Sequence, residues 1–358
     1  MRISKIKTVL KYNRTSLPIL RQGVQVSDNK LLFTNLETYV VLENFDNVGT
    51  TYGIDKELFK ANQIECENDF VKIPEHYESV TTFKPSLKFK EQIKRLLNFA
   101  GNDYLRPVMT GICLSTEFLT STDANILSDL KHDLILPNDF ECILPKELCE
   151  FLIEADGFSI SERTEGAANF KLIEVNLTID GKKAKVISRA VDGIYPKYKA
   201  VIPEVYDYNK CIELDAKKLK ELITEAKRVS KECVVSFNET FANLYKPTEN
   251  YNEYSKEGTF DLSILDKKCN TRETILMPIK PIYGQATINP RILERACKGA
   301  SLVRIYFNPN ALNRAFFLEL EYKKTSTKKR KSVSELEVII KTLTEENNRL
   351  KQKLEGVI

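Results

Sequence analysis

The sequence has few of the residues, and none of the short motifs, on which most enzymes depend. Its 358 residues include only two histidines, His76 and His132, and neither stands in a motif with a second catalytic residue type. We interpret each as a surface or capping side chain rather than a general base. A Gly-rich phosphate loop, a GxSxG motif and an HExxH motif are all missing. These absences argue against an enzyme and against a bound cofactor.

Paired cysteines are also missing. The eight cysteines are scattered along the chain and form no CxxC pair. Several stand among apolar residues, as in "TGICLS" and "ECVVSF", which is typical of reduced thiols in the core of a cytosolic protein. No metal site is predicted, because zinc ligands come in closely paired spacings.

Long apolar runs and a strong charge of one sign are lacking as well. No run of about 18 apolar residues occurs, so no membrane-spanning helix is predicted. The first residues, "MRISKIKTVLKYNRTS", are too polar for a secretory signal, which predicts a cytoplasmic location. The net charge of +4 is modest, so any argument for nucleic-acid binding depends on where the lysines lie.

What the sequence does contain is a pattern of helix, strands, helix and strands that occurs three times. The first helix of each copy is basic and amphipathic, and begins at a Ser or Asp that can cap it, over residues 4–13, 86–101 and 215–230. The second helices are predicted over residues 54–62, 144–155 and 288–300. The third copy carries an insertion over residues 250–281.

The pattern predicts an α+β protein of three repeated modules, each with two helices packed on antiparallel sheets. The modules are expected over residues 1–83, 84–204 and 205–322. A basic linker over 323–332 and a coiled-coil helix over 333–358 are expected to follow.

Lysines recur on the basic helices. A charged run on one helix is usually a solvated face, but three such helices side by side would form a positive surface that follows phosphates without reading bases. The candidate DNA-binding residues on this surface, with one arginine from the last helix, are Lys5, Lys7, Lys11, Lys88, Lys94, Lys217, Lys220 and Arg295.

Three stretches together resemble one protein family. "SRAVDGIYPKYKAVIP" (residues 188–203) has a strand, an Asp-Gly turn, an aromatic-Pro-x-Tyr segment and a closing proline. "NRTSLPILRQGVQV" (13–26) has a Leu-Pro-Ile-Leu entry, and "DYLRPVMTGICLS" (103–115) has an Arg-x-x-x-x-Gly strand. In this order and spacing, the chain resembles the bacterial DNA polymerase III beta subunit, the sliding clamp, over about residues 1–322 and most strongly over 86–203.

The resemblance implies a non-catalytic processivity factor. Two chains would join head to tail in a ring of six modules around duplex DNA, with helices lining the hole, and would tether a DNA polymerase and a clamp loader. Sliding fits sequence-independent contacts, because tight contacts to bases would hold the ring in one place. Two further DNA-contacting positions of the family correspond to Arg14 and Asn102.

The resemblance also implies an apolar pocket for partner peptides between the second and third modules. Its residues would be Met109, Thr122, Ala124, Ile126, Leu127, Pro196, Ala200 and Val201. For Met109 and Leu127, a place in the core of a strand is the alternative interpretation.

The chain departs from the family at two places near this pocket. The family's Gly-His-Arg segment is replaced by "ANI" (residues 124–126). The Met-Pro-Met-Arg-Leu-like strand that ends the family's chains, and completes the pocket, is matched only by "ILMPIK" (275–280), which comes earlier in the chain.

The last residues form a heptad repeat. Its apolar positions, with one asparagine, are Val333, Leu336, Ile340, Leu343, Asn347, Leu350, Leu354 and Val357. Asparagine at an a position favours a parallel two-stranded coiled coil, with a second copy or another protein as the partner. The alternatives are an amphipathic helix lying on the body and, because of the basic residues before it, a bZIP-like segment.

Two functions from different classes follow. The first is the sliding clamp; the alternative is a structural or regulatory DNA-binding protein, assembled by its coiled coil, that does not encircle DNA. A bacterial, plasmid or phage source is left open.

Overall fold

The computed structural model contains two compact units, residues 1–321 and 322–358. The structure describes residues 1, 3–10, 24–27, 30–43, 81–165, 168–205, 208–230, 233–237, 241–248, 253–262, 264–271, 273–276, 279–282, 285–308 and 315–323. Several predictions therefore lie outside the described residues, namely the helix over 54–62, Lys11, Arg14, His76 and the heptads over 333–357.

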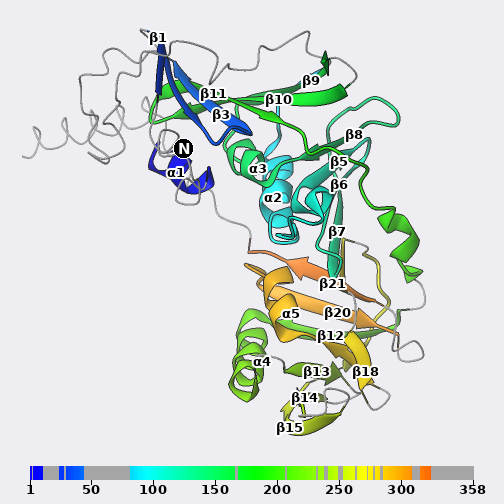
Figure 1. Ribbon diagram of the computed structural model, residues 1–358. Helices are drawn as coiled ribbons and strands as arrows, with labels where there is room; N and C mark the ends of the chain where they lie inside the picture. Colours follow the sequence, from blue (N-terminus) through cyan, green and yellow to red (C-terminus); the bar gives the residue numbers. More distant parts are fainter. Residues whose placement is uncertain are drawn as a thin grey trace, which may run out of the picture. The chain divides into compact units, whose positions relative to one another are not determined.

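A seven-stranded antiparallel sheet combines strands from the first and second predicted modules (Figure 1). In sheet order its strands are β1 (Val24–Ser27), β2 (Lys30–Thr34), β3 (Thr38–Glu43), β11 (Lys182–Arg189), β10 (Ala168–Ile179), β9 (Gly157–Glu165) and β4 (Thr81–Phe83). The pairing of β3 with β11 joins the two parts of the chain, with Val40 opposite Val186. Asp180 and Gly181, both with positive φ, form the tight turn between β10 and β11.

A nine-stranded sheet combines strands from the second and third predicted modules. In sheet order its strands are β16 (Ile264–Asp266), β12 (Lys210–Asp215), β20 (Leu302–Phe307), β21 (Phe316–Glu321), β17 (Thr274–Leu276), β7 (Ile126–Lys131), β6 (Phe118–Thr122), β5 (Ile112–Ser115) and β8 (Glu141–Leu144). The short strand β17 stands between β21 and β7 and pairs with both.

The third sheet has five strands, all from the third predicted module. In order they are β15 (Tyr254–Asp261), β14 (Phe241–Pro247), β13 (Val234–Phe237), β19 (Gln285–Ile288) and β18 (Ile279–Ile282). The insertion over 250–281 thus folds into strands of two different sheets.

Two of the three basic helices begin at the predicted cap, whereas α1 (Ile3–Val9) begins before Ser4, so that Ser4 lies within the helix and does not cap it. α2 (Leu87–Leu96) is capped by Ser86, whose Oγ accepts a hydrogen bond from the backbone N of Phe89 at 3.0 Å. α4 (Ala216–Val229) is capped by Asp215, whose Oδ1 accepts from the backbone N of Lys218 at 2.8 Å. The remaining helices are α1 (Ile3–Val9), α3 (Lys146–Leu152), α5 (Pro290–Ala296) and the 3₁₀ turns η3 (Pro107–Thr110) and η4 (Tyr198–Val201).

The helices pack in pairs against the sheets. α2 contacts α3, and α4 contacts α5 (Figure 1). The apolar faces of α1, α2 and α3 lie in one buried cluster with residues of the sheets, including Ile6, Phe89, Phe151 and Ile173. The antiparallel α+β class predicted from the sequence is confirmed.

Candidate functional site

Four of the eight candidate pocket residues lie on β6, β7 and the turn between them. Thr122 Oγ1 donates a hydrogen bond to the carbonyl of Ile126 at 2.8 Å and accepts one from the backbone N of Ala124 at 3.1 Å. Ala124 has a φ of 74°, the left-handed conformation that favours glycine, and its small side chain is exposed. Ile126 and Leu127 are buried. The turn therefore exposes a small side chain, Ala124, next to a strand whose first residues are apolar and buried.

Three more candidate pocket residues lie on or just before η4. Pro196 is half-buried, Ala200 is exposed and Val201 is 52% exposed. Tyr198, in the same turn, packs against the buried cluster that contains Leu127. η4 therefore packs against the same cluster as β7, and residues from both can line one site.

Met109, the eighth candidate, lies in η3 and is half-buried. Its carbonyl accepts a hydrogen bond from the backbone N of Gly101 at 2.8 Å. Val108, beside it, packs with Tyr198 around a small buried cluster of Cys113, Ile143 and Tyr195. This packing connects η3 to η4.

A hydrogen-bond network that the sequence did not reveal fastens η4 to the sheet. Asp129 Oδ1 accepts from Thr120 Oγ1 at 2.6 Å and from the Tyr198 hydroxyl at 3.1 Å. Burial raises the pKa of Asp129, although both hydrogen bonds oppose that rise. Burial also raises the pKa of Tyr198. The hydroxyl therefore stays protonated at neutral pH and can donate to the carboxylate.

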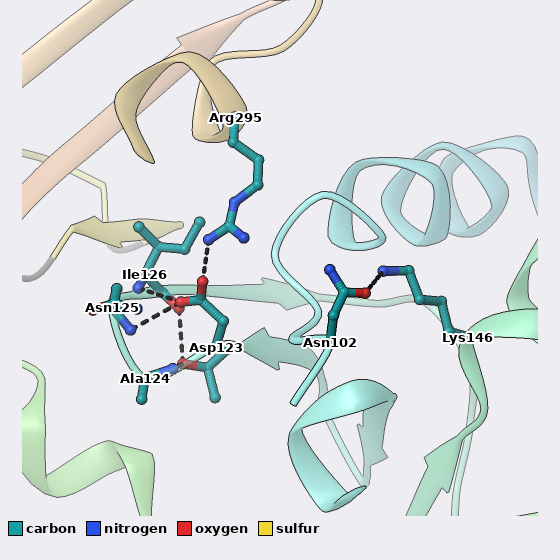
Figure 2. A network of polar contacts seen from close by, with 8 residues as sticks. Asn102, Asp123, Ala124, Asn125, Ile126, Lys146 and Arg295 are labelled. Carbon is teal, nitrogen blue, oxygen red and sulfur yellow. Dashed lines mark hydrogen bonds and ion pairs between the residues drawn. The ribbon is translucent and has the colours of Figure 1, made fainter. Parts of the chain in front are cut away.

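Charged contacts cross from the second to the third predicted module at the same turn. Figure 2 shows Arg295 of α5 reaching Asp123, which forms an ion pair with it and caps the turn by accepting from the backbone N of Asn125 and Ile126. Asp123 is mostly buried, with 12% of its side chain exposed. Arg295, a candidate DNA-binding residue, thus has a carboxylate partner within the protein.

Asn102, another candidate DNA-binding residue, is exposed in the loop after α2. Its Oδ1 accepts a hydrogen bond from Lys146 Nζ at 2.9 Å (Figure 2). Lys146 begins α3, so this contact connects the loop to the helix that packs on α2.

The candidate lysines of α2 and α4 lie on the exposed faces of these helices. Among the described residues, no carboxylate forms an ion pair with Lys88, Lys94 or Lys220, and all three are exposed. Lys217 is 3.8 Å from Glu221 on the same helix, and Lys5 of α1 is 3.3 Å from Glu150 of α3. These surface pairs are weak enough to give way to a phosphate. The side chain of Lys7 is outside the described part of the chain.

The cysteines and the histidine in the described part of the chain are buried within the fold. Seven free cysteines are buried, and burial raises the pKa of Cys142 to about 12 and that of Cys211 to about 11. His132 is buried, so the predicted surface position is wrong, and its Nδ1 accepts a hydrogen bond from the backbone N of Leu134 at 3.2 Å in the non-helical segment after β7. Within the described ranges, no cluster of metal-ligating side chains is found, and no helix is long and apolar enough to cross a membrane.

A cavity of about 450 Å³ lies apart from the candidate pocket residues. Its lining includes Glu141, Glu162, Lys171 and Gly193 but none of the eight candidates.

No family model matches the chain. The beta sliding clamp of Borreliella burgdorferi is 26% identical over 121 residues, which are 32% of this chain and 30% of that protein. The matched stretch is therefore less than a third of the relative.

Solved structures match almost the whole chain. The DNA polymerase III beta subunit of Thermotoga maritima has a TM-score of 0.57 at 14% identity, covering 88% of this chain and 96% of its own. The sliding clamp of Pseudomonas aeruginosa bound to griselimycin has a TM-score of 0.58 at 16% identity, covering 90% and 94%. The beta clamp of Helicobacter pylori bound to a DNA ligase peptide has a TM-score of 0.53 at 13% identity, covering 89% and 98%.

TM-scores of 0.53 to 0.58 over 88–90% of the chain establish the fold, and identities of 13–16% carry the likeness no further than the fold. The resemblance predicted from the sequence is confirmed, and the chain has the fold of the bacterial DNA polymerase III beta subunits, the sliding clamps.

Proposed function

We propose that this chain is a DNA sliding clamp, a non-catalytic factor that encircles duplex DNA and tethers a DNA polymerase and other partners to it. The observation that supports this best is the extent of the likeness, since clamp structures match 88–90% of the chain. A clamp-like body used for another purpose would need to retain only part of that arrangement.

The proposal includes three modules over 1–83, 84–204 and 205–322, and a ring made of two chains. Two sheets support it, because each runs without a break from one proposed module into the next, through β3 with β11 and through β17 with β7. A third continuous sheet, formed between the third module of one chain and the first module of its partner, would close a head-to-tail ring.

The DNA-facing surface would be built from the basic helices. Lys88 and Lys94 of α2 and Lys217 and Lys220 of α4 are exposed, and such lysines bind phosphates of any sequence. Lys5, Lys7, Lys11, Arg14, Asn102 and Arg295 complete the proposed set.

Partner peptides would bind at the candidate pocket residues. The Helicobacter pylori beta clamp was crystallised with a DNA ligase peptide, and this chain carries small or apolar side chains on β7, the turn before it and η4. Ala124 and Ala200 leave room for a large apolar side chain, and the exposed Lys197 and Lys199 favour an acidic residue beside it.

The heptads over 333–357 are proposed to form a parallel coiled coil beyond the ring. It would join two rings or bind a helix of a partner protein, because the two tails of one head-to-tail ring start from separate places.

The proposal is tested by the mass of the protein in solution and its choice of DNA. The chain ending at residue 331 should be a dimer and should bind duplexes of unrelated sequence with equal affinity, which falls as salt rises. A monomer, or a protein that prefers one duplex sequence, contradicts the proposal.

A further inference from the structure

In the nine-stranded sheet, the place of strand β17 does not follow the order of the chain. The strand lies between β21 and β7, although β18, β19, α5 and β20 come between β17 and β21 in the chain. Thr274 faces Ser128 of β7 on one side and Leu318 of β21 on the other. Among the described residues, every strand pairing between β5–β8 and the strands of the third predicted module therefore passes through β17.

β17 is a core strand despite its length. All three of its residues are buried, and Ile275 is 1% exposed. Ile275 belongs to the same buried cluster as Leu127 of β7 and Phe317 of β21, its two neighbours in the sheet. Apolar contact on this scale favours one fixed position for the strand.

Glu273, the residue before β17, extends the connection. Its carbonyl accepts hydrogen bonds from the backbone N of Asp129 and from Ser128 Oγ, both at 2.9 Å. Its carboxylate lies 3.4 Å from Arg95 Nη2 of α2. Backbone, hydroxyl and charged contacts from one residue thus tie the insertion to the second predicted module.

We propose that Glu273 and β17 form an internal clasp that fixes β7, and that Ile275 is thereby a positioning residue for partner-peptide binding. This rests on the sliding-clamp function proposed above, because the clasp acts through Ile126 and Leu127 of the candidate pocket. The Thr120–Asp129–Tyr198 network holds η4 to the same strands. The clasp therefore sets the distance between the two sides of the peptide site.

Every residue of the clasp belongs to the compact unit 1–321, and the C-terminal heptads follow that unit in the chain. β21 ends at Glu321 as an interior strand, and every described strand of the sheet precedes Tyr322. Peptide binding should consequently not depend on residues 332–358.

The test compares proline substitutions in two three-residue strands of the same sheet. Ile275→Pro breaks the interior strand β17, whereas Leu265→Pro alters the edge strand β16, where Leu265 is 43% exposed. The probe is a fluorescein-labelled copy of the DNA ligase peptide from the Helicobacter pylori complex, measured by anisotropy on the full chain. Ile275→Pro should weaken binding by about tenfold or more, and Leu265→Pro by about twofold at most.

Hydrogen–deuterium exchange supplies a readout that does not require the peptide. In Ile275→Pro, exchange should increase in β7 and β21 and stay unchanged in β10 and β11. If the proline variant does not fold, Ile275→Ala takes its place, since it shortens only the side chain, and the same segments should exchange faster by a smaller factor.

The outcomes distinguish the clasp from its effect on peptide binding. Unchanged exchange in β7 and β21 overturns the clasp, and faster exchange with unchanged peptide affinity overturns its positioning role. Failure of the unaltered chain to bind the peptide contradicts the proposed function and the positioning role with it. The exchange data would then still show whether β17 holds β7 and β21 together.

Discussion

At the scale of single residues, Asp129 shows how the candidate site combines burial with polar contacts. Its carboxylate is half-buried beside an apolar cluster, yet it fastens η4 to the sheet through Thr120 and Tyr198. Burial opposes its ionisation, so the folded state holds the Asp129 proton more tightly than the unfolded chain does.

This difference has a definite sign. Because the folded pKa of Asp129 is raised, the free energy of unfolding should fall as the pH rises from about 4, the ordinary pKa of an aspartate, through the raised value. Asp129→Asn cannot ionise and still offers an acceptor to both hydroxyls. We expect it to remove this pH dependence and to stabilise the protein at neutral pH by up to about 1 kcal/mol. Urea unfolding across the acidic range measures both effects.

Tyr198→Phe is the matched control for that substitution. It removes a hydroxyl that donates to Asp129 and should destabilise the fold by about 1 kcal/mol at neutral pH while keeping the pH dependence. If the free energy of unfolding of the unaltered chain rises with pH relative to that of Asp129→Asn, or if Asp129→Asn is strongly destabilised, the carboxylate is stabilising as an ion and the prediction is wrong.

At the scale of elements, lysines on the basic helices should contribute to DNA binding, whereas lysines on the strands should not. Lys88 and Lys94 are exposed on α2, and within the described part of the chain neither has an ion-pair partner. Replacing both with alanine removes four lysines from a ring of two chains, so the slope of log affinity against log salt should fall by up to about 3.6, or about 0.9 for each phosphate that the ring no longer neutralises. Anisotropy of labelled duplex DNA over a salt series measures this slope.

The matched control replaces Lys131 of β7 and Lys183 of β11 with alanine. Both are exposed on strands, so the variant has the same net charge without touching the helices. An equal reduction of the slope in the two variants would mean that DNA is attracted by total charge and not by a helical surface.

Elements also show what a sequence can and cannot predict. Ser86 and Asp215 cap α2 and α4 as expected, because capping and amphipathic spacing are local properties. The place of β17 does not follow from "ILMPIK", because three residues carry no period and their two neighbours lie far away in the chain. For the same reason the sequence does not predict the contact of Asp129 with Tyr198, 69 residues apart, while the candidate pocket residues came from a family resemblance.

At the scale of the whole molecule, the heptads raise the question of how many rings assemble. If Leu336, Ile340, Leu343, Asn347, Leu350 and Leu354 pair between rings, removing residues 332–358 should lower the mass in solution by about half. The remaining body contains the compact unit 1–321 and should stay folded. Light scattering of both chains measures the change, and a decrease equal to the mass of the tails alone would contradict pairing between rings.

The central claim is that the protein encircles DNA, and retention on circular DNA tests it most directly. The full chain is bound to a nicked circular plasmid at high protein concentration, washed in high salt to remove contacts with phosphates, and then followed before and after the plasmid is cut once. A ring should remain on the circle through the wash and leave when a free end is made. Equal retention on circular and linear DNA, or loss from both in the wash, would contradict encirclement.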